Sequence, residues 1–261
     1  MEEVNVEMVA PEGIKLPIEG GEYQRPDASL LAAMEGVSSA TASALLHKIG
    51  ITQTYIDGPL PRTPGKKIVG AALTLQFMPQ REDIASGLAQ EKVEQYSALW
   101  RVFRHVQAND VLCIQAYGDP YTGCVGEMLA TYFAAQGGIG MVVDGSVRDW
   151  PKIEEIGLPM WTRGFTPNYA SQTHLFPWAC NVPVNVSGVL VLPGDIIIAD
   201  DDGAVVVPRQ MAAAVAEVTQ EHEDWETFSR MKLAEGGSLF KYYPLNDEGR
   251  QEYEKWRKDQ S

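Results

Sequence analysis

The chain has 261 residues, and its 45% hydrophobic and 21% charged residues predict a packed globular protein. Its 35 Asp and Glu outnumber 21 Lys and Arg, which gives a net charge of −14. That charge argues against nucleic acid or an anionic membrane as a partner, because both require a basic face. It does not exclude a small anionic ligand, because one Arg beside a helix N-terminus can bind such a ligand locally.

Three cysteines without metal-type spacing argue against both a disulfide framework and a Cys-rich zinc site. The N-terminus lacks the basic and apolar segments of a signal peptide, and no apolar run is long enough to span a membrane. We therefore expect a cytoplasmic protein.

The first part of the chain predicts an irregular arm followed by helices and one strand. Residues 1–27 are rich in Glu, Gly and Pro and are expected to form an N-terminal arm. Residues 28–34 and 38–48 are predicted to be short helices, and residues 67–77 a strand. The apolar period of residues 84–106 predicts one long helix.

A βαβ unit is predicted in the middle of the chain. Residues 111–116 read as a buried strand, residues 117–123 as a loop, and residues 127–136 as a helix. Residues 139–143 form a second buried strand that Asp144-Gly145 should end. A short helix is expected from Trp150-Pro151 onward.

The remaining sequence predicts a hairpin-rich β lobe and then a long helix. Four short strands are expected within residues 182–207, because tight-turn residues separate them. Residues 208–235 read as a long amphipathic helix, and residues 236–261 as a charged, aromatic extension. We therefore expect one α/β domain over residues 28–235, with additions at both ends.

Two segments of the βαβ unit are candidates for ligand binding, because ligands bind at the carboxyl ends of strands in open α/β sheets. The first offers backbone N–H groups at a helix start; its residues are Gly126, Glu127, Met128 and Leu129. The second offers Arg148 as a planar donor and Asp149 as a metal ligand. The alternatives are an ordinary βα turn, a helix cap at Asp149 and a structural ion pair at Arg148.

The spacing between these segments is more informative, because 20 residues separate Glu127 from Arg148. The stretch GEMLATYFAAQGGIGMVVDGSVRD resembles the superfamily that contains the class II pyruvate aldolases and the regulator of ribonuclease E activity A. Its shared pattern is Gly-acid, about twenty residues, then Asp-Gly-x-x-Arg-Asp. The similarity covers roughly residues 28–235 and includes segments near residues 37–41, 163–167 and 181–203.

The resemblance implies a swivelling β/β/α core and assembly as a homotrimer or homohexamer. It also implies that Asp149 binds Mg²⁺ or Mn²⁺, that Arg148 polarises a pyruvyl group, and that Glu127 orients a water on the metal. The amides of residues 126–129 would hold the substrate carboxylate. His174 stands where the family often has a Lys that binds a second carboxylate.

The aldolases of this superfamily also receive an acid from the C-terminal helix of a neighbouring subunit. Glu226 is the first candidate for that acid, and three others lie in the same window: Glu221, Glu223 and Asp224. A solvated face is the alternative interpretation of these charges. Asp119, in the predicted loop of the βαβ unit, is a rival acid whose spacing fits the shared pattern less well.

The expected function is that of a metal-dependent aldolase, a carbon–carbon lyase. It would cleave a 4-hydroxy-2-oxo acid, such as 4-hydroxy-4-methyl-2-oxoglutarate, to pyruvate plus a second carbonyl compound. Oxaloacetate decarboxylase activity is expected alongside, because both reactions give the pyruvate enolate. The alternative is a non-catalytic, protein-binding regulator on the same fold. The sequence offers no glycine-rich strand end for an adenosine-binding methyltransferase, and no lysine between Lys92 and Lys152 for a Schiff base.

Overall fold

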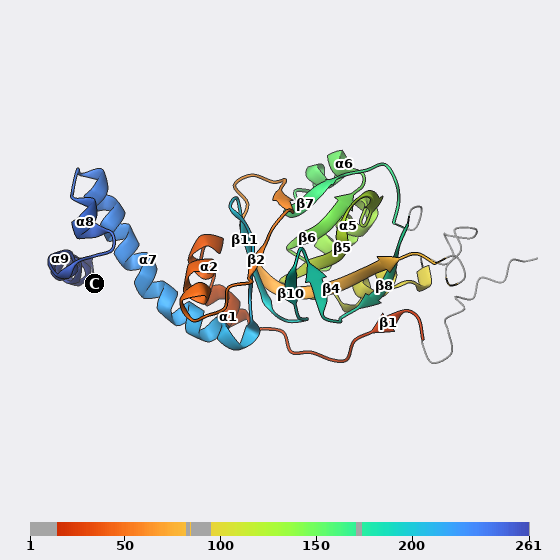
Figure 1. The fold of residues 1–261 in the computed structure, drawn as a ribbon, viewed down its shortest axis with the longest axis horizontal. Coiled ribbons are helices and arrows are strands. Elements are labelled where there is room, and N and C mark those ends of the chain that lie inside the picture. Colours follow the sequence, from red (N-terminus) through yellow and green to blue (C-terminus); the bar gives the residue numbers. More distant parts are fainter. Residues whose placement is uncertain (1–14, 82–83, 85–94, 171–173, 261) are drawn as a thin grey trace, which may run out of the picture.

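The computed structural model describes residues 15–81, 84, 95–170 and 174–260. Four parallel strands form the centre of a ten-stranded mixed sheet in this part of the chain (Figure 1). These are β4 Ile68–Pro79, β5 Asp110–Gly123, β6 Gly140–Val147 and β7 Met160–Phe165. The other strands of the sheet are β1 Ile18–Glu19, β2 Tyr55–Ile56, β3 Leu60–Pro61, β8 Leu175–Cys180, β11 Ile196–Asp200 and β12 Gly203–Val207.

One face of the parallel strands is covered by three helices. They are α4 Ala98–Val102, α5 Glu127–Ala135 and α6 Trp150–Ile156. Each contributes fully or almost fully buried apolar side chains to one cluster with the strands, for example Leu99, Phe133 and Ile153. Because α5 joins β5 to β6, which pair in parallel, the predicted βαβ unit is confirmed.

The opposite face is covered by the hairpin of β9 Val184–Val186 and β10 Val189–Val191. Helices α1 Ala28–Ala33 and α2 Ser39–Lys48 pack over β11 and β12 in a third cluster. The side chains of Asp27 and Ser38 accept hydrogen bonds from backbone N–H groups in the first turns of these helices. These caps explain why both helices begin where the sequence predicts.

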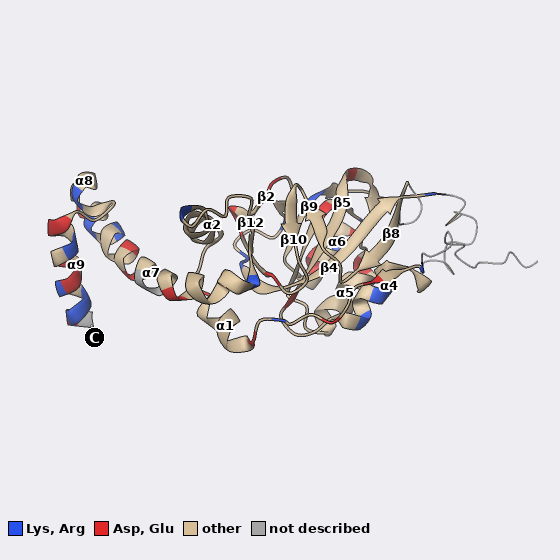
Figure 2. Cartoon of the chain, turned by 60° about the horizontal axis from the view of Figure 1, so that its bottom comes forward, with Lys and Arg blue, Asp and Glu red and all other residues tan. Residues whose placement is uncertain are grey.

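Helix α7 Ala212–Ala234 begins against this third cluster and then leads away from the sheet (Figure 1). At its far end lie α8 Leu239–Tyr242 and α9 Asp247–Gln260, which fold back on it. An aromatic cluster centred on Phe228, Tyr242 and Tyr253 joins the three helices. Acidic and basic residues occur along both α7 and α9 (Figure 2). No helix in the described ranges is both long and apolar enough to cross a membrane.

The described part of the N-terminal arm runs along the sheet. β1 pairs with β8, and Arg25 forms an ion pair of 2.7 Å with the fully buried carboxylate of Asp110. Burial raises the pKa of Asp110, and the hydrogen bond from Arg25 opposes that shift. The arm is therefore tied to the first residue of β5. The domain boundaries at residues 27/28 and 235/236 stay predictions.

The α/β class, the hairpins and the long C-terminal helix are confirmed, but several predicted elements were wrong. Residues 117–123 are the second half of β5, not a loop, and β6 continues past Asp144-Gly145 to Val147. The register between β5 and β6 shifts twice in this stretch, and Tyr117 and Gly118 have positive φ angles. Because of these irregularities, residues typical of turns remain paired with β6.

The predicted helix over residues 84–106 is not one helix in its described part. Ser97 has extended backbone angles, φ −75° and ψ 168°, and α4 begins after it. Residues 103–105 form a 3₁₀ turn. Residues 85–94 lie outside the described residues. Strands β7 and β8 were not predicted.

Candidate active site

A pocket of about 190 Å³ lies at the carboxyl ends of β5 and β6. Its lining consists of Leu99, Trp100, Gly123, Cys124, Gly126, Glu127, Met128, Leu129, Arg148, Asp149, Tyr169 and Ala170. Both segments predicted to bind a ligand therefore meet in one cavity, as expected for the ends of adjacent parallel strands.

The start of α5 supplies backbone donors to this pocket. Gly126 is the N-cap residue, and no side chain caps the helix. The first N–H groups of a helix have no partner within it, and the helix dipole places partial positive charge there. The amides of Glu127, Met128 and Leu129 are thus suited to a carboxylate.

Arg148 and Asp149 follow the last residue of β6 and sit directly beside α5. The Arg148 N–H donates to the Val125 carbonyl at 3.0 Å, and the Cys124 N–H donates to Ser146 at 2.9 Å. Arg148 Nε donates to Asp149 Oδ2 at 2.9 Å. The two terminal nitrogens of the guanidinium extend beyond that bond, so they are the donors that a ligand can use.

The helix-cap interpretation of Asp149 is not supported by the geometry. Asp149 occupies the N-cap position of α6 with left-handed backbone angles, φ 59° and ψ 33°, but its side chain makes no cap hydrogen bond. Its carboxylate lies instead in the pocket wall with 39% of the side chain exposed. Asp tolerates this conformation better than most residues, yet such backbone strain is found most often at functional sites.

Two glycines allow the Arg148 side chain to cross this region. A Cβ at Gly123 would lie 2.2 Å from the carbonyl oxygen of Asn168 and 3.1 Å from Arg148 Cβ. A Cβ at Gly126 would lie 3.0 Å from both Arg148 Cγ and Asp149 Oδ2. The backbone of Gly126 itself is extended, with φ −117°, so only the close approach requires glycine there.

Gly126→Ala should therefore displace the Arg148–Asp149 pair by a few tenths of an ångström while leaving α5 folded. We expect kcat/KM to fall on the order of tenfold, less than the ~10² that a 1 Å displacement can cost. Kinetics and thermal melting measure the two effects. Gly36→Ala is the matched control, because its added Cβ meets nothing within 4 Å. Unchanged kinetics in Gly126→Ala would contradict the tight fit.

A divalent cation in this pocket would have few protein ligands and would be held largely by water. Among the described side chains, no group of three or more His, Cys, Asp or Glu could hold a metal. Asp149 is therefore the main ligand candidate, with Glu127 on the same pocket wall. In proteins, Mg²⁺ is usually bound by one or two carboxylates, and water and substrate oxygens fill its remaining coordination positions. The carboxylate donors fit Mg²⁺ or Mn²⁺ better than zinc.

His174 and Glu226, two of the predicted site residues, do not line this pocket. His174 Nε2 contacts Asp119 Oδ1 at 2.8 Å. Burial opposes the charge on Asp119, but hydrogen bonds from Thr122 and His174 outweigh it and lower the pKa of that carboxyl. The rival acid Asp119 is thus an ion-pair partner of His174, outside the pocket lining.

Glu226 lies in the outer half of α7, where its carboxylate is 3.7 Å from His222 Nδ1. Asp224 faces Arg257 of α9 at 3.8 Å. The side chains of Glu221 and Glu223 lie outside the described residues. Among the described residues, none from α7 lines the pocket.

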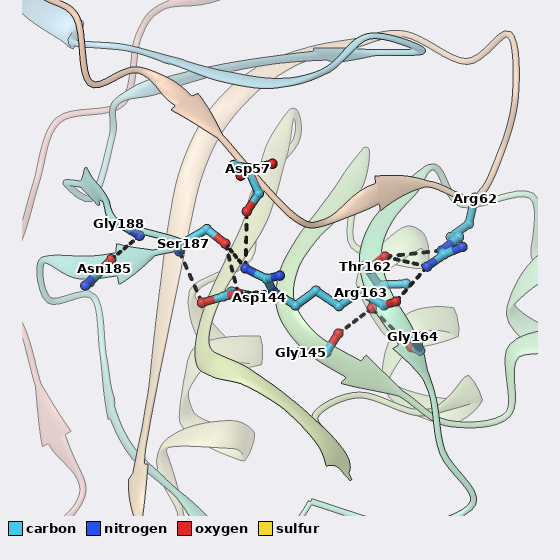
Figure 3. Close-up of polar contacts among 10 residues, drawn as sticks. All are labelled: Asp57, Arg62, Asp144, Gly145, Thr162, Arg163, Gly164, Asn185, Ser187 and Gly188. Carbon is cyan, nitrogen blue, oxygen red and sulfur yellow. Dashed lines mark hydrogen bonds and ion pairs between the residues drawn. The ribbon is translucent and has the colours of Figure 1, made fainter.

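The first acid of the DGSVRD segment has a separate, structural contact set (Figure 3). Asp144 is buried, pairs with Arg163 Nε at 2.6 Å, and accepts hydrogen bonds from the Ser187 N–H and Oγ. Arg163 also donates to Ser187 and to the Asp57 carbonyl. These contacts fasten the β9–β10 hairpin to the face of the sheet away from α5.

Several pocket residues could not be found from sequence patterns. Leu99 and Trp100 come from α4, while Tyr169 and Ala170 come from the segment after β7. Cys124 also lines the pocket, but burial raises the pKa of its thiol well above the usual range. It is therefore unsuited to act as a nucleophile.

Comparison with known proteins assigns the chain to a family. A family model described as RraA-like, Aldolase/RraA, matches residues 32–206, which is well over half of the chain. The chain belongs to the RraA-like family. The matched range contains the whole candidate pocket but ends before α7, so it excludes α7, α8 and α9.

Two curated relatives are similar to this chain over part of its length. One, from Halalkalibacterium halodurans, is named "Putative 4-hydroxy-4-methyl-2-oxoglutarate aldolase" and is 30% identical over 149 residues, 57% of this chain and 63% of its own length. Protein DlpA of Legionella pneumophila is 28% identical over 212 residues, 81% of this chain and 32% of its own length. The matches thus span less than two thirds of these relatives.

Two solved structures share the RraA-like fold. Streptomyces coelicolor RraAS2, described as an unusual member of the RNase ES inhibitor RraA protein family, is 51% identical with a TM-score of 0.74. That match covers 80% of this chain and 100% of RraAS2. An uncharacterized Pseudomonas syringae protein is 25% identical with a TM-score of 0.73, covering 85% and 96% of the two chains. The family contains both aldolases, which are metal-dependent in general, and ribonuclease regulators.

Proposed function

We propose that this protein is a divalent-metal-dependent aldolase that cleaves a 4-hydroxy-2-oxo acid to pyruvate and a second carbonyl compound. The observation that carries the proposal is the meeting of the α5 amides, Arg148 and Asp149 in one pocket. Together they offer an anion site, a planar donor and a hard-metal ligand within reach of one small molecule.

Different residues would act on the oxo acid group at C1 and C2 and on the C4 hydroxyl. The amides of residues 126–129 bind the C1 carboxylate, and Arg148 donates to the C2 oxygen. Asp149 would hold a Mg²⁺ or Mn²⁺ ion, which would supply Lewis-acid chemistry at this end of the substrate. Glu127 orients the water that takes the proton from the C4 hydroxyl.

Bond breaking then follows from that arrangement. As the C4 hydroxyl becomes a carbonyl, the C3–C4 electron pair moves into the pyruvate enolate, whose charge Arg148 stabilises. Protonation at C3 gives pyruvate. Oxaloacetate loses CO₂ by breaking the equivalent bond, so decarboxylation should accompany aldol cleavage.

The direct test is pyruvate release by the purified protein from oxaloacetate and a panel of 4-hydroxy-2-oxo acids, including 4-hydroxy-4-methyl-2-oxoglutarate. Each reaction is run with Mg²⁺, Mn²⁺ or chelator. Pyruvate formation that depends on metal supports the proposal. A folded protein that releases no pyruvate from any member of the panel would overturn it.

A protein-binding regulator is the second candidate, and the 51% identity to RraAS2 favours it. This function would require binding and inhibition of an RNase E-type enzyme, but not the pocket chemistry. Inhibition that Arg148→Ala leaves intact, in a protein without pyruvate release, would select the regulator.

We further propose that the protein is a homotrimer or homohexamer whose sites are shared between subunits. The direction of α7, away from the sheet, supports this assembly, because Glu226 lies on its outer half. A mass that is a multiple of three chains is expected by light scattering or native mass spectrometry.

A mixing experiment makes that prediction sharper. Arg148→Ala and Glu226→Ala should each be inactive alone, whereas co-refolded mixtures should regain part of the activity. Such mixtures contain sites with Arg148 from one subunit and Glu226 from another. A fully active monomer, or mixtures no more active than their parents, would rule out the shared site.

A further inference from the structure

The charges that line the pocket are unevenly distributed. Among the described lining residues Arg148 is the one cation, whereas Glu127 and Asp149 are acids. Arg101, next to Trp100 in α4, does not line the pocket. In the described lining, the positive end of the pocket therefore consists of Arg148 and the first turn of α5, which the pyruvyl group would occupy.

The rest of the lining is mainly apolar and comes from elements on either side of α5. Its members are Leu99, Trp100, Met128, Leu129, Tyr169 and Ala170. Trp100 and Met128 belong to this apolar part of the lining, and both are partly exposed, at 42% and 71%. A ligand that covers such surface gains from removing it from water.

Within the lining that the described residues of one chain supply, a second carboxylate would find no cation besides Arg148. It would face Glu127, Asp149 and the apolar wall, and burying a charge without a partner is costly. His174, which the family resemblance assigns to a second carboxylate, contacts Asp119 instead and does not line the pocket.

We infer that the site takes a 4-hydroxy-2-oxo acid whose C4 substituent is uncharged and apolar, an alkyl or aryl group, rather than a second carboxylate. This inference rests on the proposed function. The apolar group would lie against Trp100 and Met128 while the oxo acid lies against Arg148.

Two non-cleavable analogues test the inference by binding alone. 2-Oxo-4-phenylbutanoate and 2-oxoglutarate share the 2-oxo acid and lack the C4 hydroxyl, but end in a phenyl group and a carboxylate. Calorimetry with Mg²⁺ should show at least tenfold tighter binding of the phenyl compound. Equal or tighter binding of 2-oxoglutarate by the wild type would overturn the inference.

A charge placed on the apolar wall provides the matched variant. Trp100→Arg should bring the two affinities together or reverse them, because it adds a partner for the second carboxylate. Leu190→Arg adds the same charge on β10, where the side chain is 63% exposed and outside the pocket lining. It should leave the preference for the phenyl compound unchanged. A Trp100→Arg protein that keeps the full wild-type preference would contradict the proposed wall.

Turnover separates failure of this inference from failure of the proposed function. 4-Hydroxy-4-phenyl-2-oxobutanoate should release pyruvate with a kcat/KM at least tenfold above that of 4-hydroxy-2-oxoglutarate. If the dicarboxylate is cleaved equally well or better, the aldolase stands and the apolar preference is wrong. If neither compound nor oxaloacetate yields pyruvate, the aldolase and the inference that rests on it both fail.

Discussion

Replacing Arg148 with Lys should lower kcat/KM for pyruvate-releasing substrates by roughly 10²–10³-fold and leave the melting temperature nearly unchanged. Arg148 uses Nε to hold Asp149, so its terminal nitrogens stay free of that bond and can face the developing enolate. A single ammonium cannot occupy both positions. The expected loss corresponds to about 3–4 kcal/mol of transition-state stabilisation.

Stability should change little because the Arg148–Asp149 pair is more than a third exposed on both sides, and such pairs contribute little to folding. Arg163→Lys is the matched control. It weakens the hydrogen bonds to Ser187 and the Asp57 carbonyl, so it should lower the melting temperature without a specific kinetic effect. An Arg148→Lys protein that melts several degrees lower yet turns over at the wild-type rate would refute the catalytic role.

Removal of divalent metal should abolish turnover, and added Mg²⁺ or Mn²⁺ should restore it. The expected loss is roughly 10³-fold or more, because a Lewis acid at the reacting oxygen supplies several kcal/mol. Asp149→Asn should be equally inactive and should not respond to metal. Asn tolerates the left-handed backbone at this position, so the variant should keep its fold.

Manganese binding, followed by electron paramagnetic resonance, gives a readout that does not depend on turnover. Wild-type protein should bind Mn²⁺, Asp149→Asn should bind it far more weakly, and Asp202→Asn should behave as wild type. Asp202 is an exposed residue in the turn between β11 and β12, outside the pocket lining. Full activity in a metal-stripped sample would show that Asp149 is not needed as a ligand.

The sequence predicts those parts of the site that depend on residues close together in the chain. The end of a buried strand, a glycine and a helix start are encoded within a few residues, so residues 126–129 and Arg148 could be assigned to one edge of the sheet. Trp100 and Tyr169 carry no such signal, because only tertiary packing of α4 and the segment after β7 brings them to the pocket.

The errors in the fold also have physical causes. The turn-type residues of Tyr117–Gly123 favour a loop, yet pairing with β6 keeps them in the sheet. The apolar period across Ser97 is continuous, but periodicity reports which face is buried and not whether the helix is unbroken. The length of α7 was predicted because no Gly or Pro interrupts residues 212–234.

The DGSVRD segment combines two requirements that act on different sides of the sheet. Asp144 anchors the β9–β10 hairpin, and a Cβ at Gly145 would lie 2.9 Å from Ala116, so these two positions serve folding. Arg148 and Asp149 serve the pocket. A relative that had lost the catalytic activity would therefore be expected to retain Asp144 and Gly145, whereas Arg148 and Asp149 would be free to be substituted. Asp144-Gly145 would then indicate only that a protein shares this fold by descent, whereas Arg148-Asp149 would indicate that it is catalytic.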